Sequence, residues 1–173
     1  PRALFAIAES LWSLGRITDA EGAYRACIAS DPRWAEPHYN LSLILLQLGD
    51  YSGSLVEISR ALKLNNYPNW QPDFLAIRFL NGQATKADVV RALAVESEPI
   101  AIATYLYPLV DQPDPSQRDP ALVLATLAER GATLDLSDWA YLIETVARIR
   151  SADWPGALAA IEGRFTTPDA LLV

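Results

Sequence analysis

The N-terminal part of the chain carries a pattern of apolar and small residues that repeats after 34 residues. Leu14-Gly15 aligns with Leu48-Gly49, and residue size is kept at most other aligned positions. The aligned pairs are Ile7 with Leu41, Ala8 with Ser42, Leu11 with Leu45, Ala20 with Ser54, Tyr24 with Ile58, Cys27 with Ala61 and Ile28 with Leu62. Apolar residues three and four positions apart share one face of a helix. Each unit therefore predicts two helices joined by a short turn.

Turn and capping residues mark the expected ends of these helices. Gly15 and Gly49 are placed to end the opening helix of each unit, because glycine tolerates the left-handed conformation after a helix. The segment Thr18–Glu21 predicts a capping box for the first closing helix, and Ser52 predicts a cap for the second. Pro37 falls in the first turn of the second opening helix, where the missing N–H group costs nothing.

The two units resemble the tetratricopeptide repeat family, whose pattern of large, leucine, small and aromatic positions spans about 34 residues. The matching residues of the first unit are Leu4, Ile7, Ala8, Leu11, Ala20, Tyr24 and Pro32. Those of the second are His38, Leu41, Ser42, Leu45, Ser54 and Ile58, with Asn66 where the family has its final proline. The resemblance implies an all-α fold, a right-handed α-solenoid of antiparallel helix hairpins with two units in residues 1–68.

The rest of the chain fits this pattern less well. Residues 69–117 predict helices over 74–80 and 85–95, a third helix from Ser97 and an acidic, proline-rich loop over 111–117. Residues 118–164 resemble about one and a half further units, and residues 165–173 form a tail. Their signals are a closing helix over 121–128 that Gly131 ends, a helix capped by Ser137 with Trp139, Leu142 and Val146, and a closing helix with Ala157 and Ile161.

Composition and charge narrow the possible partners. Apolar residues make up 51% of the 173 residues, and the formal net charge is −7. Residues 1–68 carry a net charge of −1 and residues 69–173 a net charge of −6. This chain therefore has no basic footprint for nucleic acid or an anionic membrane. The longest apolar stretch, Leu41–Leu48, is far shorter than the roughly 20 residues that cross a bilayer.

The sequence offers little material for catalysis. His38 is the single histidine and Cys27 the single cysteine, and both fall on core positions of the repeat. We expect a packing histidine, an inert thiol, no metal, no cofactor and no enzyme activity. The acidic residues Asp111, Asp114 and Asp119 predict a solvated loop. Trp139 and Trp154 are expected in the core, whereas Trp34 and Trp70 at unit junctions suit a core or a surface position.

The sequence is compatible with more than one cellular compartment. One cysteine suits a reducing environment without requiring it. The chain begins Pro1-Arg2 and contains no methionine, so we expect a processed product or a piece of a longer polypeptide.

The resemblance implies that a partner binds the surface lined by the opening helices. The residues expected there are Phe5, Glu9, Trp12, Tyr39, Asn40, Leu43, Leu46 and Gln47, together with Ala6 and Ser13. An apolar lining of this kind suits an apolar helix or extended peptide. Alternatively, helices from residues 73–110 fold back and fill it. A clamp for C-terminal carboxylates is disfavoured, since this set contains no cation.

These features predict a non-catalytic protein–protein interaction scaffold, assembly factor or subunit of a larger complex. The partner is another protein or peptide, and no nucleic acid is expected. The alternative is a regulatory or substrate-docking segment of a larger bacterial enzyme, such as a kinase or a glycosyltransferase.

Overall fold

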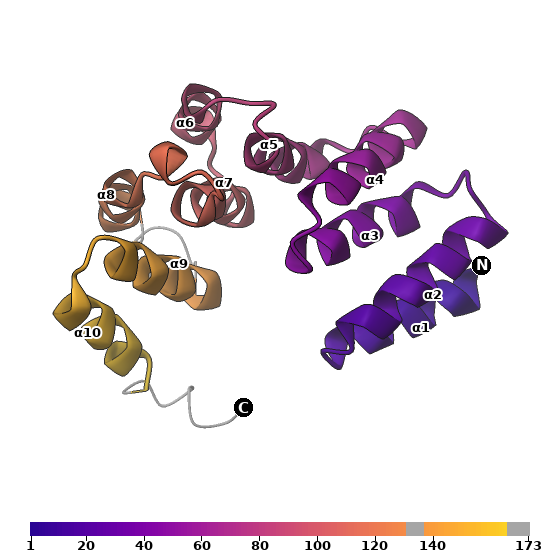
Figure 1. Ribbon diagram of the computed structural model, residues 1–173, viewed down its shortest axis with the longest axis horizontal. Helices are drawn as coiled ribbons and strands as arrows, with labels where there is room; N and C mark the ends of the chain where they lie inside the picture. Colours follow the sequence, from indigo (N-terminus) through magenta and orange to yellow (C-terminus); the bar gives the residue numbers. More distant parts are fainter. Residues whose placement is uncertain (131–136, 166–173) are drawn as a thin grey trace. The chain divides into compact units, whose positions relative to one another are not determined.

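A computed structural model describes residues 1–130 and 137–165 of the chain (Figure 1). Every regular element in these residues is helical: ten α-helices and two short 3₁₀ helices. The all-α fold of helix hairpins predicted from the sequence is confirmed. The chain divides into two compact units, residues 1–84 and residues 85–173, and each is described by itself.

The first unit contains two helix hairpins and one additional helix. Helix α1 (Arg2–Ser13) pairs with α2 (Ile17–Ser30), and α3 (Ala35–Gln47) pairs with α4 (Tyr51–Leu64). Helix α2 also packs on α3, which joins the hairpins. A 3₁₀ turn, η1 (Pro68–Trp70), then leads into α5 (Gln71–Leu80), which packs on α4.

The turns of the two hairpins are built in the same way. Gly15 and Gly49 adopt φ values of +71° and +78°, as predicted for glycines that end a helix. The Gly15 N–H donates to the Trp12 carbonyl at 2.9 Å, and the Gly49 N–H donates to the Leu46 carbonyl at 3.1 Å. Both glycines therefore occupy the left-handed region of the backbone, which L-amino acids rarely adopt.

Two predicted helix caps are wrong. Helix α2 already begins at Ile17, so Thr18 lies inside the first turn and forms no capping box. Helix α4 is capped by Asp50, whose Oδ1 accepts the Gly53 N–H at 2.9 Å. Ser52 only donates its hydroxyl to Asp50, at 3.0 Å. The ionised carboxylate two residues earlier is the stronger acceptor, and it begins the helix in place of the serine.

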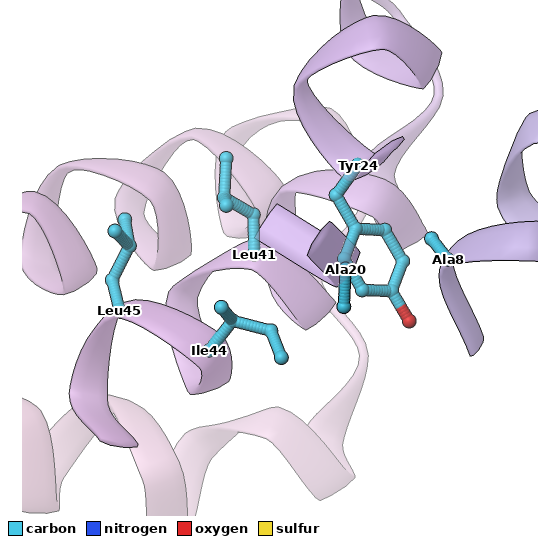
Figure 2. Packing of buried hydrophobic residues seen from close by; sticks show 6 residues of the cluster. All are labelled: Ala8, Ala20, Tyr24, Leu41, Ile44 and Leu45. Atoms are coloured by element: carbon cyan, nitrogen blue, oxygen red, sulfur yellow. The ribbon is translucent and has the colours of Figure 1, made fainter. Parts of the chain in front are cut away.

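The core of the first unit is built around small residues at the helix crossings. Figure 2 shows six fully or almost fully buried residues from α1, α2 and α3, namely Ala8, Ala20, Tyr24, Leu41, Ile44 and Leu45. Ala8 and Ala20 have no exposed surface. Ser42 and Ser54, the matching residues of the second hairpin, are also completely buried. The small positions that the 34-residue repeat identified are therefore the positions of closest packing.

The second unit is also helical throughout its described residues. Its elements are α6 (Lys86–Val95), α7 (Pro99–Asp111), η2 (Pro115–Gln117), α8 (Pro120–Arg130), α9 (Ser137–Arg150) and α10 (Trp154–Phe165). The capping box at Thr85 is confirmed, with the Thr85 hydroxyl accepting the Asp88 N–H at 3.2 Å. Helix α9 packs on α7, α8 and α10, so it lies at the centre of this unit.

The tryptophans have different environments. Trp154 is 63% exposed, so its predicted core position is wrong. Trp154 is the first residue of α10, and no helix in the described part of the chain packs over its ring enough to bury it. Trp70 is buried and Trp34 is half-buried. The side chains of Trp139, Leu142 and Ile161, and the predicted helix end at Gly131, lie outside the described residues.

We predict that Ala8→Trp destabilises the first unit by about 1–3 kcal/mol or more, because the indole has no space at a fully buried helix crossing. Thermal and urea unfolding followed by circular dichroism would measure this. Ile7→Trp is the matched control, since Ile7 is 51% exposed and an indole fits there without repacking. Equal unfolding midpoints for the two variants would contradict the packing described above.

A second prediction concerns the buried hydroxyl of Ser54, which has no hydrogen-bond partner. Ser54→Ala is expected to raise the free energy of unfolding by about 1 kcal/mol, because an unpaired polar group is removed without leaving a large cavity. Ser42→Ala is the control, since the Ser42 hydroxyl donates to the Tyr39 carbonyl at 2.6 Å and its removal brings no gain. Urea denaturation would separate the two; a loss of stability in Ser54→Ala would contradict the prediction.

Candidate protein-binding face

The opening helices α1 and α3 present the side chains predicted to contact a partner. We call the surface formed by Phe5, Glu9, Trp12, Tyr39, Asn40, Leu43, Leu46 and Gln47 the α1–α3 face. Two hydrogen bonds hold members of this face in place. The Trp12 indole N–H donates to Gln47 Oε1 at 3.1 Å, and Asn40 Nδ2 donates to the Tyr24 hydroxyl at 3.1 Å. The first bond joins α1 to α3 directly, and the second joins α3 to α2.

Tyr24 of α2 supports the α1–α3 face from beneath. Its ring meets Phe5 and Trp12 edge-to-face, with centroids 5.8 and 6.4 Å apart, and Phe5 also lies 4.8 Å from Trp34. Burial raises the pKa of Tyr24 to about 12, although the hydrogen bond from Asn40 acts in the opposite direction. The phenol is therefore neutral at physiological pH, and it holds Phe5 and Trp12 in fixed orientations.

The apolar part of the α1–α3 face is partly covered by its own members. Phe5, Trp12, Leu43 and Leu46 are half-buried, whereas Glu9 and Gln47 are exposed. Glu9 is the only charged residue among the eight. The face is thus an ordered surface of rings and aliphatic groups with one carboxylate at its edge, and it is less open than the sequence pattern alone predicts.

Tyr39 differs from the other members, because residues of η1 and α5 contact it. Its ring stacks on Trp70 at a centroid distance of 4.4 Å and an interplanar angle of 7°, and its hydroxyl donates to Asp73 Oδ2 at 2.7 Å. Tyr67 meets Trp70 edge-to-face at 4.7 Å. Sequence reasoning placed Tyr39 on the binding surface but missed Trp70 and Asp73 as its partners. The sequence feature that could have indicated this contact is the position of Trp70 at a unit junction.

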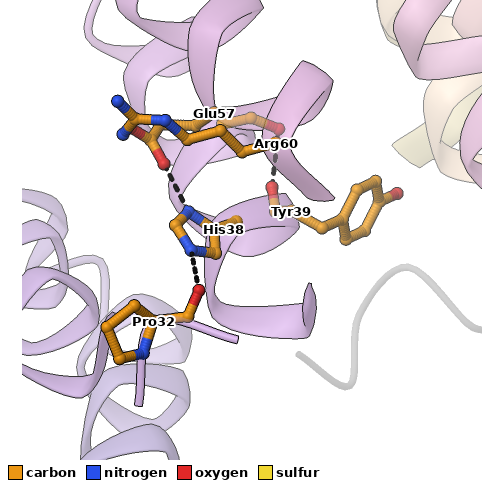
Figure 3. A network of polar contacts seen from close by, with 6 residues as sticks. Pro32, His38, Tyr39, Glu57 and Arg60 are labelled. Carbon is orange, nitrogen blue, oxygen red and sulfur yellow. Dashed lines mark hydrogen bonds and ion pairs between the residues drawn. The ribbon is translucent and has the colours of Figure 1, made fainter. Parts of the chain in front are cut away.

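His38 is the packing histidine expected from the sequence. It is 4% exposed, and both ring nitrogens face oxygen atoms (Figure 3). Nδ1 lies 2.6 Å from Glu57 Oε2, and Nε2 lies 3.2 Å from the Pro32 carbonyl. Arg60 in turn donates to Glu57 at 2.7 Å. Both ring nitrogens are engaged within the fold, so the ring joins α3 to α4 and to the preceding loop.

The remaining candidates for chemistry are buried or bonded to neighbouring residues. Cys27 is buried, and burial raises the pKa of its thiol, so little reactive thiolate forms. The three acidic residues expected in one loop have separate partners. Asp111 pairs with Arg150, Asp114 accepts the Ser116 N–H, and Asp119 pairs with Lys86. Within the described residues, no group of three potential ligands could hold a metal ion.

Comparison with known proteins gives one positive result. Two segments, residues 1–33 and 35–67, match the family model of the tetratricopeptide repeat. No curated protein and no solved structure matches the chain. In the part of the chain that the structure describes, no helix is long and apolar enough to cross a membrane.

A third prediction follows from the contact between Tyr39 and Asp73. Burial raises the pKa of Asp73 above its ordinary value of 3.8, and the Tyr39 hydrogen bond only partly offsets this. A raised acid pKa stabilises the fold fully below the ordinary value, and this stabilisation is lost as pH rises through the folded-state value. Asp73→Asn keeps a neutral oxygen acceptor, so we expect it to be more stable than wild type at neutral pH.

This advantage should shrink as the pH falls through the raised pKa toward 3.8. Urea unfolding of both proteins at a series of pH values would measure the difference. A wild-type protein that is more stable than Asp73→Asn at neutral pH would show that the ionised carboxylate is favourable at this site.

Proposed function

Residues 1–67 form two tetratricopeptide repeats, and from this we propose that the first unit binds a segment of another protein on its α1–α3 face. Repeats of this kind generally mediate protein interactions. Each hairpin contacts its neighbours and leaves one side of the opening helices available. The bound segment would be an amphipathic helix or an extended peptide with apolar side chains.

The observation that carries the proposal is the ordered set of half-buried side chains on successive opening helices. Phe5 and Trp12 come from α1, and Leu43 and Leu46 come from α3. Tyr24 and the Trp12–Gln47 hydrogen bond restrict the rings before any partner arrives. A surface ordered in advance loses little side-chain entropy on binding, and aromatic anchors supply much of the binding energy of protein interfaces.

The charge of this face limits which peptide segments can bind there. Glu9 is exposed on α1, and the α1–α3 face carries no arginine or lysine. A terminal carboxylate or phosphorylated segment would meet repulsion there and no bidentate donor. The partner segment is therefore apolar and bears no acidic group opposite Glu9.

We propose a non-catalytic role as a scaffold, assembly factor or subunit of a larger complex. The polar contacts of His38 and the burial of Cys27 support this, since both are used in packing. A second candidate is a regulatory or docking segment of a larger enzyme.

The fourth prediction tests the α1–α3 face directly. Affinity capture of the chain from its native lysate, with quantitative mass spectrometry, would compare wild type with the double variant Trp12→Ala, Leu46→Glu. We expect the variant to lose at least about 90% of a stoichiometric partner. Removing one aromatic anchor and introducing a buried charge each costs about 1 kcal/mol or more, so the two together cost about 2 kcal/mol or more, on the order of thirtyfold in affinity.

One further variant is a control, and another is a second test of the α1–α3 face. Val56→Glu lies on α4, is 49% exposed in the parent and should retain the partner. Glu9→Lys changes an exposed side chain only, so it keeps the fold while reversing the charge of the α1–α3 face. Retention of the partner by both the double variant and Glu9→Lys, with unchanged circular dichroism, would refute binding at this face.

A further inference from the structure

His38 lies where three parts of the first unit meet. It projects from α3, it is almost completely buried, and its ring contacts Glu57 on α4 and Pro32 in the loop between α2 and α3 (Figure 3). That loop connects the first helix hairpin to the second. The ring therefore links the second hairpin to the segment that leads into it from the first. Because His38 is the single histidine of the chain, its protonation can be followed without interference.

The two atoms that face the ring are both hydrogen-bond acceptors. The Pro32 carbonyl has no proton to donate, so Nε2, 3.2 Å away, must carry a proton for this contact to be a hydrogen bond. Nδ1 lies 2.6 Å from Glu57 Oε2, and a hydrogen bond there requires a second proton between these two atoms. A neutral imidazole has one N–H group, whereas the doubly protonated ring has two. Only the doubly protonated ring donates to both oxygens.

The surroundings of Glu57 favour placing the second proton on the ring. The Arg60 guanidinium donates to Glu57 Oε1 at 2.7 Å, and an arginine pairs with the ionised form of a carboxylate. Glu57 then offers the ring an acceptor and no donor. If the ring were neutral with its proton on Nε2, the Nδ1 lone pair would face this carboxylate inside the fold, and unpaired buried polar atoms are destabilising. The arrangement is therefore complementary to a charged imidazole.

Two other carboxylates lie close to the imidazole in the sequence, and both have partners of their own. Asp31 Oδ1 accepts the Arg33 N–H at 3.2 Å in the loop. Glu36 Oε1 accepts the Tyr67 hydroxyl at 3.4 Å. Glu57 is therefore the carboxylate that contacts the ring in the part of the chain that the structure describes.

We propose that His38 is a proton-sensitive joint between the two repeat hairpins. When the ring takes up a second proton, it completes both hydrogen bonds and an ion pair with Glu57, and so fixes the second hairpin to the loop that follows the first. When the ring loses that proton, one acceptor faces a lone pair and the joint loosens. This stabilisation is fully present at low pH and is lost as pH rises through the range, about pH 5 to 8, in which histidine changes its charge. The joint operates within the first unit and needs no partner on the α1–α3 face.

The test compares the pH dependence of unfolding in wild type and in variants of the full chain. His38→Gln keeps a polar side chain of similar length that does not titrate. Glu57→Gln keeps the ring but replaces the carboxylate by an amide, which can donate to a neutral ring nitrogen. Glu36→Gln is the matched control, since it neutralises a nearby carboxylate that bonds Tyr67 instead of the ring. Urea unfolding of each protein would be followed by circular dichroism from about pH 5 to about pH 8.

We expect the unfolding equilibrium constant of wild type, divided by that of His38→Gln, to rise at least about fivefold over this pH range. The same ratio for Glu57→Gln should stay constant within about twofold, and Glu36→Gln should follow wild type. Asp73 is present in all of these proteins, so its own titration cancels in the ratios. A wild-type ratio that stays constant or falls as pH rises would overturn the proposal, and so would an undiminished rise in Glu57→Gln.

The ring N–H groups of the wild-type protein give an independent readout that needs no variant. Nuclear magnetic resonance of the ¹⁵N-labelled chain observes them directly. At about pH 5 we expect slowly exchanging protons on both Nδ1 and Nε2 of His38, because both hydrogen bonds protect them from water. Rapid exchange of both protons, as in an exposed histidine, would overturn the proposal even if a variant failed to fold.

Discussion

The close approach of helices at small residues is the constraint on which the first unit depends. Ala8 and Ala20 let α1 and α2 come together, and this brings Tyr24 between α1, α2 and α3. The buried Tyr24 ring contacts Phe5 and Trp12, and its hydroxyl accepts a hydrogen bond from Asn40. These three side chains of the α1–α3 face are thereby held in place. A larger residue at either alanine would separate the hairpin and, with it, disperse the side chains of the α1–α3 face. The stability of the first unit and the arrangement of the α1–α3 face therefore rest on the same crossing.

Much of the first unit could be predicted from the sequence, because its determinants are local and repeat with a fixed period. The glycine turns were predicted from the conformational freedom of glycine, and the small crossing residues from the 34-residue repeat and the family resemblance. The predicted caps at Thr18 and Ser52 are wrong. Helix α2 begins one residue before Thr18, and at α4 the carboxylate of Asp50 is a better acceptor than the nearby hydroxyl. The exposure of Trp154 likewise depends on which helices surround it, and the repeat pattern does not contain that information.

The candidate site, like the fold, could be predicted from the sequence only in part. The sequence placed its eight residues on the two opening helices, and the helices are found where expected. Whether those residues face a partner remains a proposal. The pairing of Tyr39 with Trp70 and Asp73 depends on where α5 docks, and α5 lies outside the repeating pattern. The half-buried state of Phe5 and Trp12 also arises from contacts across helices, through Tyr24 and Gln47, that single-helix periodicity does not reveal.

The flat stacking of Trp70 on Tyr39 has a spectroscopic consequence. Trp70 is 4% exposed in the first unit, whereas Trp154 is 63% exposed in the second. An aqueous quencher such as iodide reaches the second indole and is excluded from the first. With the other three tryptophans, Trp12, Trp34 and Trp139, replaced, the two emission components would act as separate optical reporters, one for the docking of α5 and one for the solvent around α10. Loosening of one unit could be followed without a label while the other stays folded.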